Sequence, residues 1–149
     1  MVAGAKGGQG CTTIAAVLAV LAAHNNQPTL LLDTRGDAAP TLGVSDPAPA
    51  STFGEAIANA EPCRGLRVAM LAGDRIDADA INAIGELVAL GHRVIVDTGT
   101  DHDVLHRFDP LHTTTTIVTV TKMLHVDTQD GRNTVRSSDS NTATMMRLR

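Results

Sequence analysis

Short apolar runs alternate with helical patterns along most of the chain. Runs rich in Leu, Val, Ile and Thr predict strands, and several have the continuous apolar character of strands buried on both faces. These strands are expected at 1–4, 28–33, 65–73, 93–99 and 115–121. Helical patterns are expected at 11–24, 52–60 and 77–90, and Ser51 is the expected cap of the second helix. The alternation predicts an α/β fold with a doubly wound, mostly parallel sheet and right-handed crossovers.

Two of the predicted strands end in an aspartate. Asp33 closes the run Leu30–Leu32, and Asp97 closes the run Val94–Val96. The stretch 34–44 that follows the first of them is rich in turn formers and is expected to be a loop. Ligands of open α/β sheets bind beyond the carboxyl ends of parallel strands. We therefore expect Asp33 and Asp97 to converge on one site.

A glycine-rich stretch lies between the short first strand and the first helix. Its sequence from Ala5 to Thr13 is AKGGQGCTT. Glycines allow positive φ and let successive N–H groups approach an anion, and the following helix adds its partial positive charge. A threonine inside the helix can offer its hydroxyl to Mg²⁺. Against the phosphate-binding pattern G-x-x-x-x-G-K-[ST], Gly10 and Thr12 match, whereas Ala5 replaces the first glycine and Cys11 replaces the lysine.

The same stretch resembles the deviant Walker A loop, K-G-G-x-G-K-[ST]-[ST], of the ParA/MinD family of P-loop ATPases. The resemblance rests on Lys6, Gly7, Gly8, Gln9, Gly10, Thr12 and Thr13. It implies that residues 6–13, Cys11 included, contact ATP, and that Lys6 reaches the phosphates of a partner subunit in an ATP-dependent homodimer. The second lysine of the motif is absent, because Cys11 occupies its position. The implied fold is P-loop NTPase-like but incomplete, since the resemblance covers about 120 residues.

The resemblance also assigns roles to the acidic residues. Asp97 is similar to a Walker B acid, so Thr12 and Asp97 are expected to hold Mg²⁺, with Asp33 as a further metal candidate. Asp33 resembles the first acid of the family's D-x-D-P-Q segment, but Arg35 stands where the second acid would be, and Asp37 is a candidate to substitute for it if the loop bends differently. The catalytic candidates are Lys6, Asp33 and Asp37. The alternative for Asp33 is that it only ends its strand and caps the following turn.

These departures from the motif suggest slow or absent hydrolysis. A charged donor at Cys11 would contribute about 1.5–3 kcal/mol to phosphate binding, and the cysteine cannot. A thiol at a helix N-terminus is also expected to have a lowered pKa and to be reactive, although a small residue tolerated in a degenerate loop is the simpler interpretation. The implied role is positioning or partitioning of DNA, of division machinery or of a pilus or secretion assembly in a bacterial cell. The alternative is a degenerate scaffold or localisation protein without turnover that binds a protein partner.

A third hypothesis is a zinc hydrolase. His102 and His106 are spaced as in H-E-x-x-H sites, with Asp103 in place of the general-base glutamate and His112 as a third ligand. Aspartate is shorter than glutamate, and Pro110 leaves little room for the long helix that such sites use. We rank this hypothesis below the two others.

Composition limits the partners and the compartment. The net charge of −4 and pI near 5.8 give no overall attraction for DNA or anionic membranes. The two cysteines, Cys11 and Cys63, form no disulfide framework, which favours the cytoplasm. The apolar run 14–23 resembles part of a secretory signal but is too short to span a membrane. We expect residues 1–121 to form the nucleotide-binding α/β domain and 122–149, rich in Ser, Thr, Asn and Asp, to form a polar tail that is a candidate for disorder.

Overall fold

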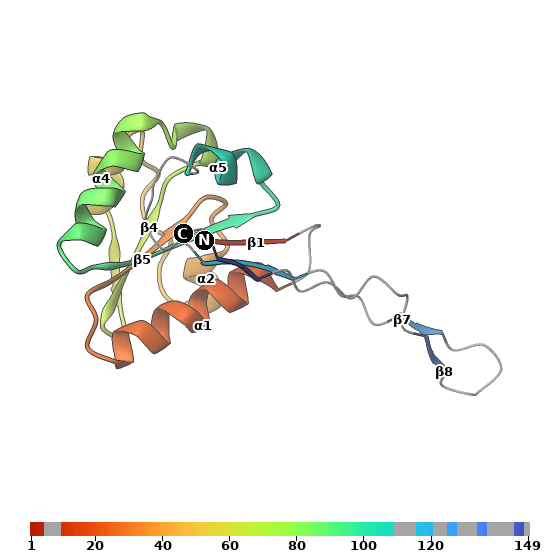
Figure 1. Ribbon diagram of the computed structural model, residues 1–149. Coiled ribbons are helices and arrows are strands. Elements are labelled where there is room, and N and C mark those ends of the chain that lie inside the picture. The colour runs from red at the N-terminus through yellow and green to blue at the C-terminus, as the bar shows by residue number, and fades with distance from the viewer. Residues whose placement is uncertain (5–9, 109–115, 121–124, 128–133, 137–144, 148–149) are drawn as a thin grey trace.

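The computed structural model describes residues 1–4, 10–108, 116–120, 125–127, 134–136 and 145–147. Within these residues a seven-stranded sheet has the order β3-β4-β2-β5-β1-β6-β9. Its strands β1, β4 and β5 are labelled in Figure 1. The strands are β1 (Val2–Gly4), β2 (Thr29–Asp33), β3 (Glu61–Cys63), β4 (Leu66–Met70), β5 (Arg93–Gly99), β6 (Thr116–Val120) and β9 (Met145–Arg147). The five strands from β4 to β6 in this order run parallel, while β3 and β9 pair antiparallel at the two edges. The predicted α/β fold with a mostly parallel sheet is confirmed.

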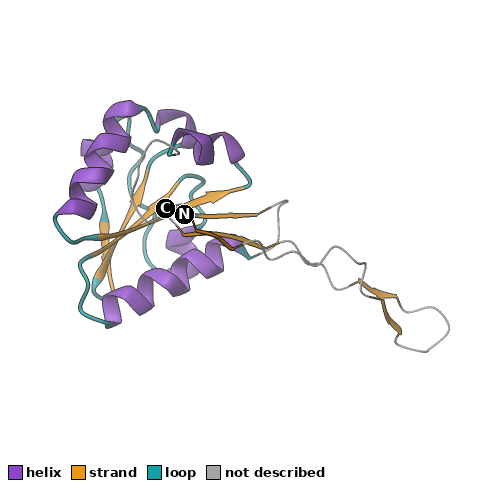
Figure 2. Cartoon of the chain, in the orientation of Figure 1, coloured by secondary structure: helices purple, strands orange, loops and turns teal. Residues whose placement is uncertain are grey.

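Helices lie on both faces of this sheet (Figure 2). The helices are α1 (Cys11–His24), α2 (Ala38–Leu42), α3 (Phe53–Ala58), α4 (Ala78–Ala89) and α5 (His102–Arg107), with a 3-10 turn, η1 (Gly73–Arg75). Leu30 and Leu32 of β2 pack into a core cluster with residues of α3, α4 and α5. Leu31, between them, packs on the opposite face with residues of α1 and α2. The continuous apolar run of β2 is explained by this burial on both faces.

The helix starts show how side chains set the boundaries. The second predicted helix begins at Phe53 rather than at residue 52, and its cap is Thr52 rather than Ser51. The Glu55 N–H donates to Thr52 Oγ1 at 3.2 Å, while the Ser51 N–H donates to the Glu55 carboxylate at 2.8 Å. Both polar residues before the helix are therefore used, one through its hydroxyl and the other through its backbone. Asp77 caps α4 in the same way, through the Ala80 N–H at 2.9 Å.

Among the elements that the sequence did not predict are α2 and β3. The predicted loop 34–44 contains α2, whose Pro40 is in the first turn, where a missing N–H costs no hydrogen bond. The strand β3 contains Pro62 and pairs only with β4, at the edge of the sheet. A proline is tolerated at such an edge because its missing donor faces away from the neighbouring strand. Local propensity indicated a loop at 34–44 and no strand at 61–63, whereas position in the fold allows regular structure at both.

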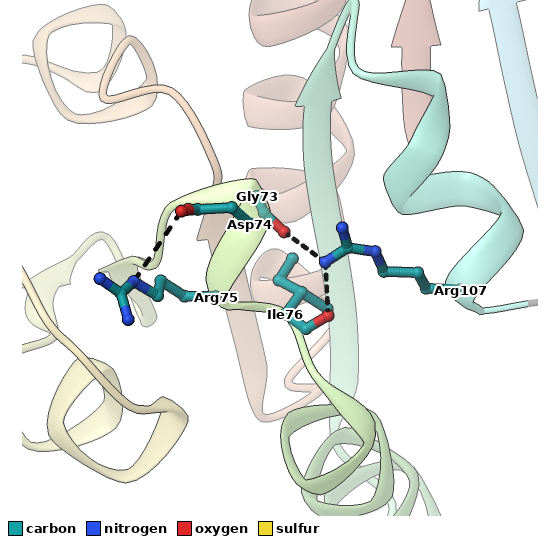
Figure 3. A network of polar contacts seen from close by, with 5 residues as sticks. All are labelled: Gly73, Asp74, Arg75, Ile76 and Arg107. Atoms are coloured by element: carbon teal, nitrogen blue, oxygen red, sulfur yellow. Dashed lines mark hydrogen bonds and ion pairs between the residues drawn. The ribbon is translucent and has the colours of Figure 1, made fainter.

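A close contact joins η1 to α5 beside the carboxyl end of β4. Nη1 of Arg107 donates to the carbonyls of Gly73 and Ile76 at 3.1 and 3.0 Å (Figure 3). A Cβ at Gly73 would lie 2.6 Å from Oδ2 of Asp101, which leaves no room for a side chain. Arg75 forms an ion pair with Asp74 at 3.9 Å on the exposed side of η1. The Arg107 side chain thus holds the segment after β4 against α5, the helix that follows β5.

The last part of the chain contributes short strands. β7 (His125–Asp127) and β8 (Thr134–Arg136) pair antiparallel in a separate two-stranded sheet. β9 returns to the main sheet and pairs with β6, with Ile117 opposite Met146. The division of the chain at residues 121 and 122 stays a prediction. Among the described helices none is both long enough and apolar enough to cross a membrane.

Candidate functional site

The carboxyl ends of β1, β2 and β5 meet at one edge of the sheet. Asp33 and Asp97 are direct register partners on the parallel strands β2 and β5, and Val2 of β1 is the partner of Asp97 on the other side. The chain leaves β1 through α1 towards β2, whereas it leaves β5 through α5 towards β6. The connections after two adjacent strands thus run in opposite directions. Such a switch point is where open α/β sheets form a ligand crevice.

The glycine at the start of α1 is required by its backbone conformation. Gly10 has φ 80° and ψ 20°, in the left-handed region, and its carbonyl accepts the Ile14 N–H at 2.9 Å. A Cβ there would meet no atom within 4 Å, so the constraint is the dihedral angle and not space. Since glycine has no side chain, Gly10 cannot cap the helix, and amide donors of the first turn are left for solvent or an anion.

Thr12 and Asp97 lie close together in the fold although they are 85 residues apart in the sequence. The Thr12 side chain hydrogen-bonds the carboxylate of Asp97, whose Oδ1 also accepts the Gly99 N–H at 3.1 Å. Burial raises the pKa of Asp97, and the nearby Asp33 and Asp37 carboxylates raise it further, while the hydrogen bonds from Thr12 and Gly99 oppose the rise. A bound cation would favour the charged form of this carboxylate. A hydroxyl and a carboxylate in contact are ligands suited to Mg²⁺.

Asp33 has a different environment. Its Oδ1 accepts the N–H groups of Arg35 and Gly36 at 2.8 and 2.9 Å, and its Oδ2 accepts the Ala38 N–H at 2.6 Å. The buried carboxylate therefore holds the loop from β2 to α2 in place. This is the geometry of the loop-capping alternative. A role for Asp33 in metal binding or catalysis stays a prediction.

Two buried threonines fix the end of β5 to its neighbours. Thr34 donates both its N–H and its hydroxyl to the carbonyl of Asp97, at 3.1 and 2.9 Å. The Thr98 hydroxyl donates to the carbonyl of Val2 at 3.1 Å. Thr34 was not among the predicted site residues. Its place in the sequence, directly after the aspartate that ends a buried strand, is a signal that its hydroxyl can bond to the neighbouring strand. These contacts position the backbone that carries Asp97.

The predicted lowering of the Cys11 pKa is wrong. Cys11 is buried in the core cluster beneath α1, and this burial, followed by the negative charge of Asp97, raises the pKa of the thiol. A backbone hydrogen bond in the first turn lowers the pKa but does not offset these effects. A neutral, buried thiol is the expected form at neutral pH. Cys11 therefore offers no charge to a phosphate.

Arg35 and Asp37 lie in the loop after β2. The Arg35 side chain passes over Gly99, so that a Cβ at Gly99 would overlap Cδ of Arg35. Gly99 also has φ 56°, and both constraints require glycine there. Asp37 is exposed and precedes α2, and its carbonyl accepts the Thr41 hydroxyl at 2.7 Å. The Asp37 carboxylate lies near enough to Asp97 to raise the pKa of Asp97. A catalytic role for Asp37 stays a prediction.

Several predicted residues lie outside the described ranges. The range 5–9 contains Lys6, Gly7, Gly8 and Gln9 of the predicted phosphate loop. Thr13, by contrast, is described and is exposed in the first turn of α1. His102 and His106 belong to α5, but their side chains are outside the described part, as is all of His112. Among the described side chains no group of three or more His, Cys, Asp or Glu residues could hold a metal ion. The zinc hypothesis therefore stays a prediction without support from geometry.

Comparison of the chain with protein-family models finds no match, and a search of curated proteins finds none either.

Proposed function

We propose that this protein binds Mg²⁺-ATP in the manner of ParA/MinD-like P-loop proteins, in the crevice beyond the carboxyl ends of β1 and β5. The observation that carries the proposal is the contact between Thr12 and Asp97. In P-loop proteins Mg²⁺ is held by a threonine or serine at the start of the helix and by an acid at the end of a second strand. The sequence predicted these two residues separately, and the fold puts them in hydrogen-bonding contact.

The topology supports the same proposal. The stretch 5–10 connects the carboxyl end of β1 to the N-terminus of α1, and β1 lies between β5 and β6 inside a parallel sheet with helices on both faces. We interpret this arrangement as a doubly wound P-loop NTPase-like fold. Phosphates bound there would lie against the first turn of α1, where backbone donors and the helix dipole favour an anion. Lys6 and the other residues of range 6–9 would complete the phosphate site.

Hydrolysis is proposed to be weak or absent. Cys11 is buried and uncharged where the motif has a lysine, and Arg35 occupies the position of an acid that orients the attacking water. Phosphoryl transfer depends on such positioning and charge stabilisation. In this proposal an ATP-held homodimer positions DNA, division machinery or a pilus or secretion assembly in the cytoplasm of a bacterial cell.

A second candidate is a scaffold that keeps the fold and has lost nucleotide turnover. The buried thiol of Cys11 and the use of Asp33 as a loop cap favour it, because two residues of the site serve the fold. The two candidates differ in whether Mg²⁺-ATP binds at all.

Calorimetry with Mg²⁺-ATP tests the proposal. The full chain is expected to bind, and Thr12→Val should weaken binding about 10-fold in the presence of Mg²⁺, since a metal ligand is lost. Thr41→Val, which removes a hydroxyl from an exposed position on α2, is the matched control and should leave binding unchanged. Failure of the unmodified chain to bind Mg²⁺-ATP would refute the proposal and favour the scaffold. Cys11→Lys should add turnover if the site is a genuine ATP site that has lost its charge.

A further inference from the structure

We propose that the Arg35 guanidinium binds the terminal phosphates of the nucleotide and supplies the positive charge that Cys11 cannot. The inference deepens the proposed function and rests on it. It assigns the phosphate-binding cation to the loop between β2 and α2, and not only to the glycine-rich loop. Arg35 is thus proposed to contribute to binding.

Two observations place Arg35 at the carboxyl end of β5. Its backbone N–H donates to Oδ1 of the buried Asp33 at 2.8 Å. Its side-chain stem lies over Gly99, with Cγ and Nε at 3.5 and 3.3 Å from where a Cβ of Gly99 would be. Gly99 donates its N–H to the Asp97 carboxylate at 3.1 Å. The stem of Arg35 therefore crosses the carboxyl end of β5, the strand that carries the proposed magnesium ligand.

The guanidinium at the end of this stem has no partner among the described residues. The other two described arginines near this edge are engaged, Arg75 in its ion pair with Asp74 and Arg107 with the carbonyls of Gly73 and Ile76. Arg35 makes no ion pair and no side-chain hydrogen bond within the described ranges, and it is exposed to solvent. A side chain that lies over the end of β5 with an unused planar donor set is suited to bidentate phosphate binding.

The carboxylates at this edge favour such a cation. Asp33 and Asp97 are direct register partners at the ends of β2 and β5, and Asp37 lies in the loop after β2. An ATP phosphate chain would be repelled by these carboxylates unless cations lie between them. Mg²⁺ at Thr12 and Asp97 supplies part of the charge. Cys11 is neutral, and the only lysines of the whole sequence are Lys6 and Lys122, so a nearby arginine is the remaining described source of positive charge.

The test compares Arg35→Ala with Arg75→Ala, which removes the same charge from an exposed position after β4. Both are titrated calorimetrically with Mg²⁺-ATP, with Mg²⁺-tripolyphosphate and with AMP. Arg35→Ala should weaken binding of ATP and tripolyphosphate about 10- to 100-fold, and that of AMP less than about 3-fold, because the contact is with terminal phosphates. Arg75→Ala should change each affinity less than about 2-fold. In the Arg35→Ala background, Cys11→Lys should restore part of the lost affinity.

The outcomes separate this inference from the proposed function. Binding of Mg²⁺-ATP by the unmodified chain with no loss in Arg35→Ala would overturn the role of Arg35 and leave the nucleotide site standing. Absence of binding by the unmodified chain would overturn both. If the alanine variant loses its cooperative thermal transition, Arg35→Gln replaces it, because glutamine keeps a stem over Gly99 without the charge. An equal loss for AMP and ATP would also refute a contact with terminal phosphates.

Discussion

Asp33 and Asp97 end adjacent parallel strands in direct register, yet their carboxylates serve different purposes. Asp33 accepts three backbone N–H groups of its own loop, at 2.8, 2.9 and 2.6 Å. Asp97 accepts one backbone N–H and a hydroxyl from a different element, α1, and burial raises its pKa. Two aspartates with the same sequence context thus differ in what the following loop offers them. The loop after Asp33 folds back on it with three N–H groups, whereas the chain after Asp97 offers one and leaves the carboxylate within reach of α1.

The largest expected difference between the two is in stability. Asp33→Asn should lower the free energy of unfolding by about 3 kcal/mol, because a buried acceptor is replaced by an amide group that cannot accept the Ala38 N–H. Asp97→Asn should lower it by less than about 1 kcal/mol, since the neutral amide also removes the cost of burying a charge. Urea unfolding of both variants measures this. Equal losses would show that Asp33 has no special capping role.

Nucleotide binding should show the reverse order. Asp97→Asn is expected to weaken Mg²⁺-dependent ATP binding about 30-fold, or about 2 kcal/mol, because a charged metal ligand is lost. Calorimetry with and without Mg²⁺ checks this, since binding measured in EDTA should change little. Asp79→Asn is the matched control, being an exposed aspartate in the first turn of α4. An equal effect of the two variants would mean that the loss of affinity does not come from a metal ligand at Asp97.

The close approach of the Arg35 stem to Gly99, at the end of β5, can be tested by adding a side chain at Gly99. Gly99→Ala should cost about 2 kcal/mol, because it adds a Cβ at φ 56° and that Cβ overlaps the Arg35 stem. Gly43→Ala is the matched control, with φ 71° and no atom within 4 Å of its Cβ, and should cost only about 1 kcal/mol. Thermal unfolding gives both values. The double variant Gly99→Ala with Arg35→Ala should regain the difference, and failure to do so would place the strain elsewhere.

The sequence predicted the strands that carry these residues, and for Asp33 it left a site role and a loop cap as alternatives. The bounds of α1 and β5 follow from continuous apolar runs, which depend on local pattern alone. The cap at Asp33 depends on where the N–H groups of the loop to Ala38 point, and the contact of Thr12 with Asp97 depends on β1 lying beside β5. The pKa of Cys11 was predicted with the wrong sign, because helix position was visible in the sequence and burial was not.

The smallest expected effect is a pH dependence that belongs to Asp97. Its pKa in the folded protein is raised above the ordinary value of 3.8, so the folded state holds this proton more tightly than the unfolded state. As pH rises through the interval from 3.8 to the folded pKa, Asp97 therefore makes the unmodified protein less stable, and above this interval its contribution is constant. The stability difference between Asp97→Asn and the unmodified protein should thus grow in favour of the variant across that interval. Urea unfolding between pH 3 and 8 measures the difference. A difference that moved in the opposite direction would mean that the hydrogen bonds from Thr12 and Gly99 outweigh burial, and that Asp97, like Asp33, is held as an anion by its surroundings.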